Sequence, residues 1–165
     1  MPRHACLLTR LLPFVLLLAC APSHAADPPQ WWLDVNLASQ HFGDEDEFLA
    51  EGESFNEFNP GLGVEVQWQP RHAVAAGYFR NSVDDDSLYA LYQYTPLQLG
   101  RYVRVGGMVG AVTGYPGHND GGPAPAAGLV AKIEGARLGA NVIVLPRIAD
   151  RIPATLGLQF KVRLR

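Results

Sequence analysis

Two side chains of the types that act on esters stand at the ends of apolar, alternating segments. His41 follows one such segment and Ser82 follows another. A histidine can act as a general base, and a serine hydroxyl needs such a base to attack an acyl group. His72 and His118 lie in polar turns and are expected to be solvated. We therefore predict His41 and Ser82 as candidate catalytic residues, the ordinary alternative being solvated side chains at strand ends.

The start of the 165-residue chain has the pattern of an export signal. Arg3 and Arg10 precede a short apolar run over 11–19, and a small-x-small sequence ends at Ala25. We predict a signal peptide over 1–25 and one domain over 26–165. An alternative is lipidation at Cys20, because residues 17–20 loosely resemble a lipobox.

The composition after the predicted cleavage site excludes several classes of protein. Cleavage removes two of the 13 basic residues and none of the 16 acidic ones, so the domain is acidic. An acidic domain lacks the basic face that a sequence-independent nucleic-acid binder requires, and we expect no nucleic-acid partner. Both cysteines, Cys6 and Cys20, precede the cleavage site, which leaves no disulfide, thiol nucleophile or thiolate metal site. We predict no metal and no cofactor.

The elements that must position His41 and Ser82 are β-strands. Apolar and polar residues alternate with a period of two, which is the signature of a strand with two different faces. Eight such segments cover residues 31–39, 61–69, 73–80, 87–94, 102–112, 128–134, 137–144 and 155–164. Short and long connections between them alternate along the chain, as in bacterial outer-membrane barrels. We predict an all-β fold, an eight-stranded antiparallel up-and-down transmembrane β-barrel with both termini in the periplasm.

Periodicity does not say which face of the strands points inward. A soluble barrel of the lipocalin type also alternates, with its apolar face inside. One of the two faces of the predicted strands carries the charged residues, which are Asp34, Glu65, Arg104, Lys132, Glu134, Arg137, Lys161 and Arg163. Aromatic residues stand near the strand ends at Trp31, Trp68 and Phe160, as interfacial girdles require. These aromatics favour the membrane barrel and a location in the bacterial outer membrane.

Several motifs in order along the chain resemble the lipid A palmitoyltransferase family. They are His41, Phe55-Asn56-Glu57, Pro60-Gly61-Leu62-Gly63, Tyr78-Phe79-Arg80-Asn81-Ser82 and Pro123-Ala124-Pro125. The match in order and spacing extends from about residue 32 to residue 165. The resemblance implies an eight-stranded outer-membrane barrel that moves an acyl chain from a phospholipid onto lipid A. It places the catalytic residues at His41, Asn81 and Ser82 and makes membrane lipids, including lipopolysaccharide, the partners of a monomer.

The chain differs from that family at the position where the family has a catalytic aspartate. Asn81 stands where the family has an aspartate, and an amide cannot compensate the charge of an imidazolium. Asp84, Asp85 or Asp86 could substitute for the missing carboxylate. We expect weak activity that Asn81→Asp raises. The alternatives are a catalytically silent barrel that serves envelope integrity and a soluble lipid carrier.

An acidic loop follows His41. Its carboxylates are Asp44, Glu45, Asp46, Glu47, Glu51, Glu53 and Glu57. A run of like charges is ordinarily a solvated surface, which is the first interpretation. The second is binding of divalent cations that bridge lipopolysaccharide phosphates, because hard cations prefer carboxylate oxygens.

Overall fold

The computed structural model describes residues 28–50, 53–148 and 152–165. The predicted signal peptide, Cys20 and Glu51 lie outside the described residues. Two single-turn 3-10 helices occur in loops, η2 (Glu45–Glu47) and η3 (Asn119–Gly121). Within the described ranges, no helix is long and apolar enough to cross a membrane.

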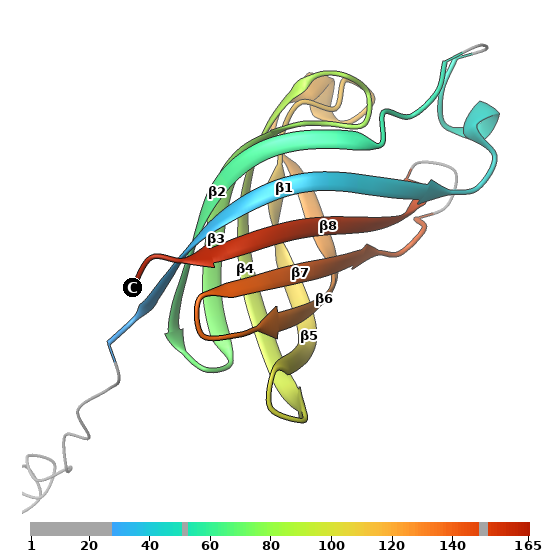
Figure 1. Ribbon diagram of the computed structural model, residues 1–165. Helices are drawn as coiled ribbons and strands as arrows, with labels where there is room; N and C mark the ends of the chain where they lie inside the picture. Colours follow the sequence, from blue (N-terminus) through green and yellow to red (C-terminus); the bar gives the residue numbers. More distant parts are fainter. Residues whose placement is uncertain (1–27, 51–52, 149–151) are drawn as a thin grey trace, which may run out of the picture.

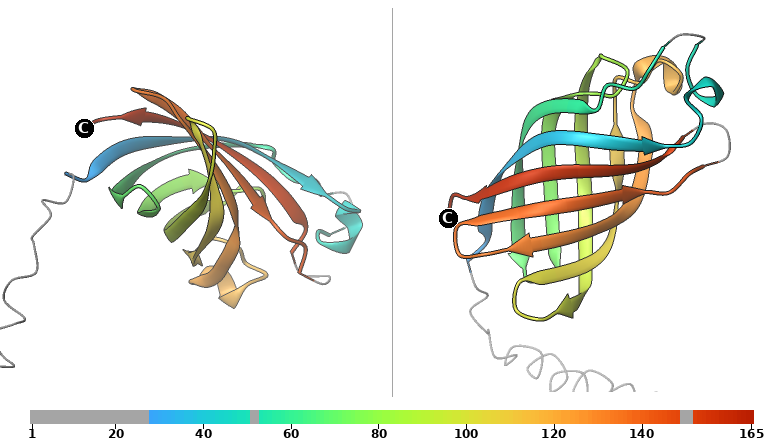
Figure 2. Two further views of the ribbon diagram at one scale, coloured as in Figure 1. Left: turned by 90° about the horizontal axis from the view of Figure 1, so that it is seen from below. Right: turned by 45° about the vertical axis from the view of Figure 1, so that its right-hand side comes forward.

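Eight antiparallel strands form a closed barrel in which each strand pairs with its neighbours in sequence and β1 pairs with β8 (Figures 1 and 2). The strands are β1 (Gln30–Phe42), β2 (Phe58–Gln69), β3 (His72–Arg80), β4 (Asp86–Leu99), β5 (Val103–Val112), β6 (Ala124–Glu134), β7 (Leu138–Leu145) and β8 (Ala154–Arg163). This topology confirms the predicted fold class. We call the end with the long loops, which follow β1, β3, β5 and β7, the outer end of the barrel.

The charged face of the strands points into the lumen, except at Arg137, which is exposed in the turn between β6 and β7. Asp34, Glu65 and Lys161 have no solvent-exposed surface, whereas Leu62 is 58% exposed and Leu129 is 58% exposed on the outside. A soluble barrel would place the apolar face inside, so this facing is that of a barrel whose wall contacts lipid. Aromatic residues lie on the outside near the strand ends, including Trp31, Trp68 and Phe160.

Buried ion pairs fill the inner half of the lumen. Glu65 on β2 accepts hydrogen bonds from Lys132 Nζ of β6 at 2.9 Å and from Lys161 Nζ of β8 at 2.6 Å. Lys161 also bonds Glu134, which pairs with Arg104 at 2.6 Å. Because these side chains meet from strands on several sides of the barrel, they close the lumen toward the inner end.

Three strands are longer at the outer end than the alternation predicts. β1 continues through His41 to Phe42 because its outer end pairs with β8, with His41 opposite Thr155. β2 begins at Phe58 and β6 at Ala124, both inside segments expected to be loops. Pro125 reads as a loop residue in the sequence, yet it lies in β6 opposite Ala111 of β5. Pairing between neighbouring strands overrides the local loop signal at these positions.

Candidate functional site

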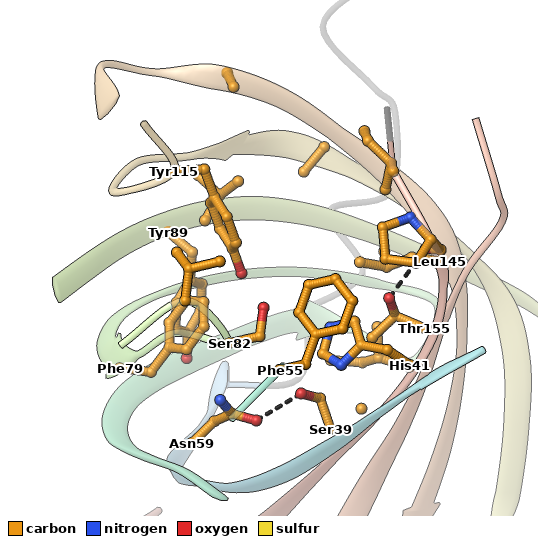
Figure 3. A pocket seen from close by; sticks show the side chains of 18 of the residues that line it. Ser39, His41, Phe55, Asn59, Phe79, Ser82, Tyr89, Tyr115, Leu145 and Thr155 are labelled. Atoms are coloured by element: carbon orange, nitrogen blue, oxygen red, sulfur yellow. Dashed lines mark hydrogen bonds between the residues drawn. The ribbon is translucent and has the colours of Figure 1, made fainter. Parts of the chain in front are cut away.

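An apolar cavity of about 320 Å³ occupies the outer half of the barrel, above the buried ion pairs (Figure 3). Phe79, Leu91, Met108 and Ile143 contribute to its wall, and loop residues Phe48 and Phe55 line its mouth. Tyr89, Asn36 and Gln159 form the inner side of the cavity, where Gln159 Nε2 donates to Asn36 Oδ1 at 2.6 Å. Gln159 also accepts from Asn141, which reaches Glu65, so the floor of the cavity joins the charged network.

His41 lines this cavity at the outer end of β1. Its ring stacks on Phe55, with 4.2 Å between the ring centroids and an interplanar angle of 17°. The Nδ1 atom is buried and has no hydrogen-bond partner among the described residues. The imidazole is therefore held by stacking and by its strand, and its Nδ1 atom is shielded from solvent.

Ser82 lines the same cavity from the loop that follows β3 and is 4% exposed. The hydroxyl of Tyr115, which reaches the cavity from the loop after β5, lies beside Ser82. Figure 3 shows the two hydroxyl groups turned toward each other in the cavity wall. Burial raises the pKa of the Tyr115 phenol, and the polar groups of Ser82 lower it in part. The phenol accordingly stays neutral at physiological pH.

Asn81 is fully buried outside the cavity, and its amide is saturated by hydrogen bonds. Nδ2 donates to Ser87 Oγ at 3.0 Å and to the Gly114 carbonyl at 2.6 Å. Oδ1 accepts from the backbone N–H groups of Val83 and Asp85 at 3.0 and 2.9 Å. These four bonds use the full capacity of an asparagine side chain, so none remains for His41.

The structure brings His41 and Ser82 to one cavity but does not bring Asn81, Asp84, Asp85 or Asp86 to His41; the carboxylates whose charges act on His41 are those of Glu57 and Glu45. Among the described residues no hydrogen bond joins His41 to Ser82. Asp84 accepts from Asn56, and Asp86 accepts from Tyr78 and Arg80 on the outside of the barrel. The expectation that Asp84, Asp85 or Asp86 supplies the missing carboxylate therefore has no geometric support.

The sequence analysis did not predict Tyr115 or Phe55 as site residues, and it interpreted His118 differently. Tyr115 follows Gly114, whose φ of +85° marks a turn that aims the next residue inward. Phe55 carries no signal beyond its place in the motif that follows the acidic stretch. His118, expected to be solvated, is half-buried and lines the cavity.

The acidic loop binds the chain's own donors. Glu57 accepts from Gln40 Nε2, Glu45 accepts from the N–H of Phe55 at 3.3 Å, and Glu47 pairs with Arg147 at 2.8 Å. Within the described part of the chain, no group of three or more acidic, histidine or cysteine side chains could hold a metal ion. The loop carboxylates thus support the interpretation as a surface rather than as a cation site.

Along its outer part, β6 pairs with only one of its two neighbouring strands. Residues 124–128 pair with β5, but pairing with β7 begins at Leu129, opposite Val144. β7 ends at Leu145 and is followed by Pro146, which cannot donate a backbone hydrogen bond. Ala124, Leu145 and Pro146 all line the cavity. The wall beside the cavity consequently lacks strand pairing where β6 and β7 face each other.

A designed barrel of known structure shares this architecture. The chain resembles the solution NMR structure of de novo designed TMB2.3, with a TM-score of 0.57, 18% identity and coverage of 84% of this chain and 98% of the designed one. It also matches outer membrane protein AlkL, solved by solid-state NMR in DMPC lipid bilayers, with a TM-score of 0.40, 16% identity and coverage of 88% and 92%. No model of a protein family matches the chain, and no curated protein matches it. The closed topology and the likeness to the designed barrel give the molecule the fold of an eight-stranded transmembrane β-barrel, whereas the resemblance to lipid A palmitoyltransferases stays a prediction.

Proposed function

We propose that the protein is an outer-membrane barrel that takes the hydrocarbon chain of a membrane lipid into its outer cavity. The observation that carries the proposal is an apolar cavity inside a barrel whose inner half is closed by buried ion pairs. Burial of methylene groups in such a cavity is favourable by about 0.8 kcal/mol each. The partners are phospholipid and lipopolysaccharide, and the barrel acts as a monomer.

The closed inner half supports lipid binding over passage of a solute through the lumen. A molecule that moved along the barrel axis would have to part Glu65, Lys132 and Lys161, which have at most 2% side-chain exposure. Breaking a buried ion pair leaves uncompensated charge and costs several kcal/mol. The cavity is then a dead end that exchanges its contents with the outer leaflet.

The unpaired stretch between β6 and β7 supports a lateral entrance. Residues 124–128 lack strand partners on the β7 side, and the same residues border the cavity. Separation of two strands that share no hydrogen bonds requires no loss of ladder bonds. A lipid chain can therefore enter from the outer leaflet without opening the barrel elsewhere.

A cavity-filling variant tests this function. A Cβ at the inward-facing Gly157 would meet only Ile143 Cβ at 3.6 Å, so Gly157→Phe fills the cavity without a backbone clash. The matched control is Gly107→Phe on the outward face, where a Cβ would meet only the Gly128 carbonyl at 3.7 Å. Equilibrium binding of radiolabelled dodecane to the purified barrels should be lost in Gly157→Phe and kept in Gly107→Phe. Equal binding by both variants would place the chain outside the barrel and refute the proposal.

A second candidate function is transfer of an acyl chain onto lipid A. The observation that favours it is the presence of His41 and Ser82 on one cavity, with a ring nitrogen of His41 unpartnered. In this role His41 is the base and Ser82 carries the reacting hydroxyl, while Asn81 acts only by positioning Ser82. Mass spectrometry of lipid A from cells with and without the gene, and with His41→Ala, tests it. An additional acyl chain that depends on His41 supports transfer, and lipid A of identical mass in all three strains refutes it.

A further inference from the structure

Ser82 and Tyr115 place two hydroxyl groups on the cavity wall from neighbouring loops. Ser82 comes from the loop between β3 and β4, and Tyr115 comes from the loop between β5 and β6. Their hydroxyl groups are turned toward each other (Figure 3), whereas the Ser39 and Thr155 hydroxyls of the same wall donate to Asn59 and to the Pro153 carbonyl. Each hydroxyl carries one hydrogen, so the pair has a donor to offer to an acceptor. A polar group on a bound chain can therefore be met at this point of the wall.

The cavity offers no fixed positive charge. Its lining contains no lysine and no arginine among the described residues, and His41 and His118 are its only basic side chains. A carboxylate moved into such surroundings would lose its hydration without gaining an ion pair, which is strongly unfavourable. A neutral carbonyl oxygen needs only one donor, which the hydroxyl pair supplies.

Asn81 connects the loop that carries Ser82 to the loop that carries Tyr115. Its Nδ2 bonds the Gly114 carbonyl, one residue before Tyr115, while Asn81 itself precedes Ser82. Gly114 has a φ of +85°, and a Cβ there would lie 2.2 Å from the Asp86 carbonyl oxygen. Ser87 Oγ adds a bond to the Thr113 carbonyl at 2.6 Å. Asn81 is thus a positioning residue that brings the two hydroxyls together.

We propose that Ser82 and Tyr115 form a polar subsite, positioned by Asn81, that binds an uncharged carbonyl oxygen at the head of an apolar chain and rejects a carboxylate. The subsite rests on the proposed chain-binding function and adds a choice among chains. It distinguishes an ester-linked chain from a free fatty acid of the same length. Tyr115 is then the residue that recognises the head of the chain, while the apolar wall holds its tail.

Three ligands of equal chain length test the subsite: dodecane, methyl dodecanoate and dodecanoate. Equilibrium binding is measured at pH 9 on the full barrel held in an amphipol. At this pH the carboxylate is ionised, while the Tyr115 phenol, whose pKa is raised by burial, keeps its proton. Methyl dodecanoate should bind at least about tenfold more tightly than dodecanoate, because the ester has no charge to bury.

Tyr115→Phe keeps the ring and removes the hydroxyl. It should weaken methyl dodecanoate about three- to tenfold, the range for one hydrogen bond, and leave dodecane binding unchanged. The matched control is Tyr102→Phe, at a tyrosine that is 53% exposed outside the cavity, which should bind all three ligands like the wild type. A selective loss in Tyr115→Phe supports the subsite.

The other outcomes overturn the inference in distinguishable ways. Binding of dodecanoate as tight as that of the ester, or an unaltered ester affinity in Tyr115→Phe, refutes the subsite while chain binding stands. Failure of all three ligands, dodecane included, to bind the wild type refutes the chain-binding function and the subsite with it.

Discussion

Lys161 Nζ lies 2.6 Å from Glu65 Oε1, between two strands that β1 separates, and neither side chain is exposed to solvent. Lys132 Nζ reaches the same carboxylate oxygen at 2.9 Å. Glu65 therefore contacts two ammonium groups inside the barrel, and Glu134 supplies Lys161 with a second carboxylate at 2.9 Å. This arrangement divides the lumen into a charged, closed inner half and an apolar outer half.

Glu65→Gln should destabilise the barrel by about 3–5 kcal/mol, because it leaves the buried Lys132 ammonium without its carboxylate and Lys161 with Glu134 alone. Adding Lys132→Met to Glu65→Gln should recover part of the loss, since it removes the ammonium group that has lost its partner. The measurement is the free energy of unfolding in urea with the barrel in lipid vesicles. The control is Asp86→Asn, which breaks an exposed pair with Arg80. Comparable losses in Glu65→Gln and Asp86→Asn would contradict a structural role for the buried network.

Val64→Arg tests whether the apolar outer face contacts lipid. Val64 lies in the middle of β2 and is 40% exposed on the outside of the barrel. Arginine on the lipid face near the midplane of a bilayer costs about 2–4 kcal/mol, and near the interface about 0–1 kcal/mol. Leu99→Arg, at the inner end of β4, is the interfacial control. If the wall faced water, Val64→Arg would fold as stably as Leu99→Arg and be recovered in the soluble fraction.

The fold could be predicted from the sequence because alternation and turn lengths are local properties. The strands and the closure of the barrel follow from these properties. Which face of the strands points into the lumen is seen only in the closed barrel, where Glu65 contacts Lys161, 96 residues later in the chain. The outer ends of β1 and β6 were missed because His41 and Pro125 gain strand geometry from neighbours distant in sequence.

The candidate site was predictable only in part. His41 and Ser82 could be assigned to one end of the barrel by counting hairpins, whereas their meeting at one cavity depends on the tilt and closure of the strands. The role of Asn81 could not be read from its position in a motif. It depends on Gly114, 33 residues later, whose carbonyl accepts the amide hydrogen.

Asn81→Asp keeps the shape and the acceptors of the side chain but removes its two amide donors. The bonds to Ser87 and Gly114 should be lost, and a buried acceptor left without its donor costs about 1–3 kcal/mol. We expect lower stability and weaker binding of methyl dodecanoate. The additional loss of ester affinity should vanish in the Tyr115→Phe background, because Asn81 acts on the ligand through Tyr115.

This expectation reverses the one drawn from the family resemblance, in which an acid at position 81 raises activity. A double-mutant cycle of Asn81→Asp and Tyr115→Phe, measured as ester and dodecane affinity, separates the two. Stronger ester binding or acyl transfer in Asn81→Asp would show that position 81 needs a carboxylate and that the hydrogen-bond account of Asn81 is wrong.

Met108 can serve as an NMR probe of the cavity, because it lies in the cavity wall and is only 4% exposed. The only other methionine of the sequence, Met1, precedes the predicted cleavage site. In a methyl-labelled sample the NMR signal of the Met108 methyl group reports on the cavity directly. Titration with dodecane should shift this signal saturably in the wild type and in Gly107→Phe, and should leave it unmoved in Gly157→Phe. A Met108 signal that stays constant while dodecane binds the wild type would contradict the central claim that the chain lies inside the barrel.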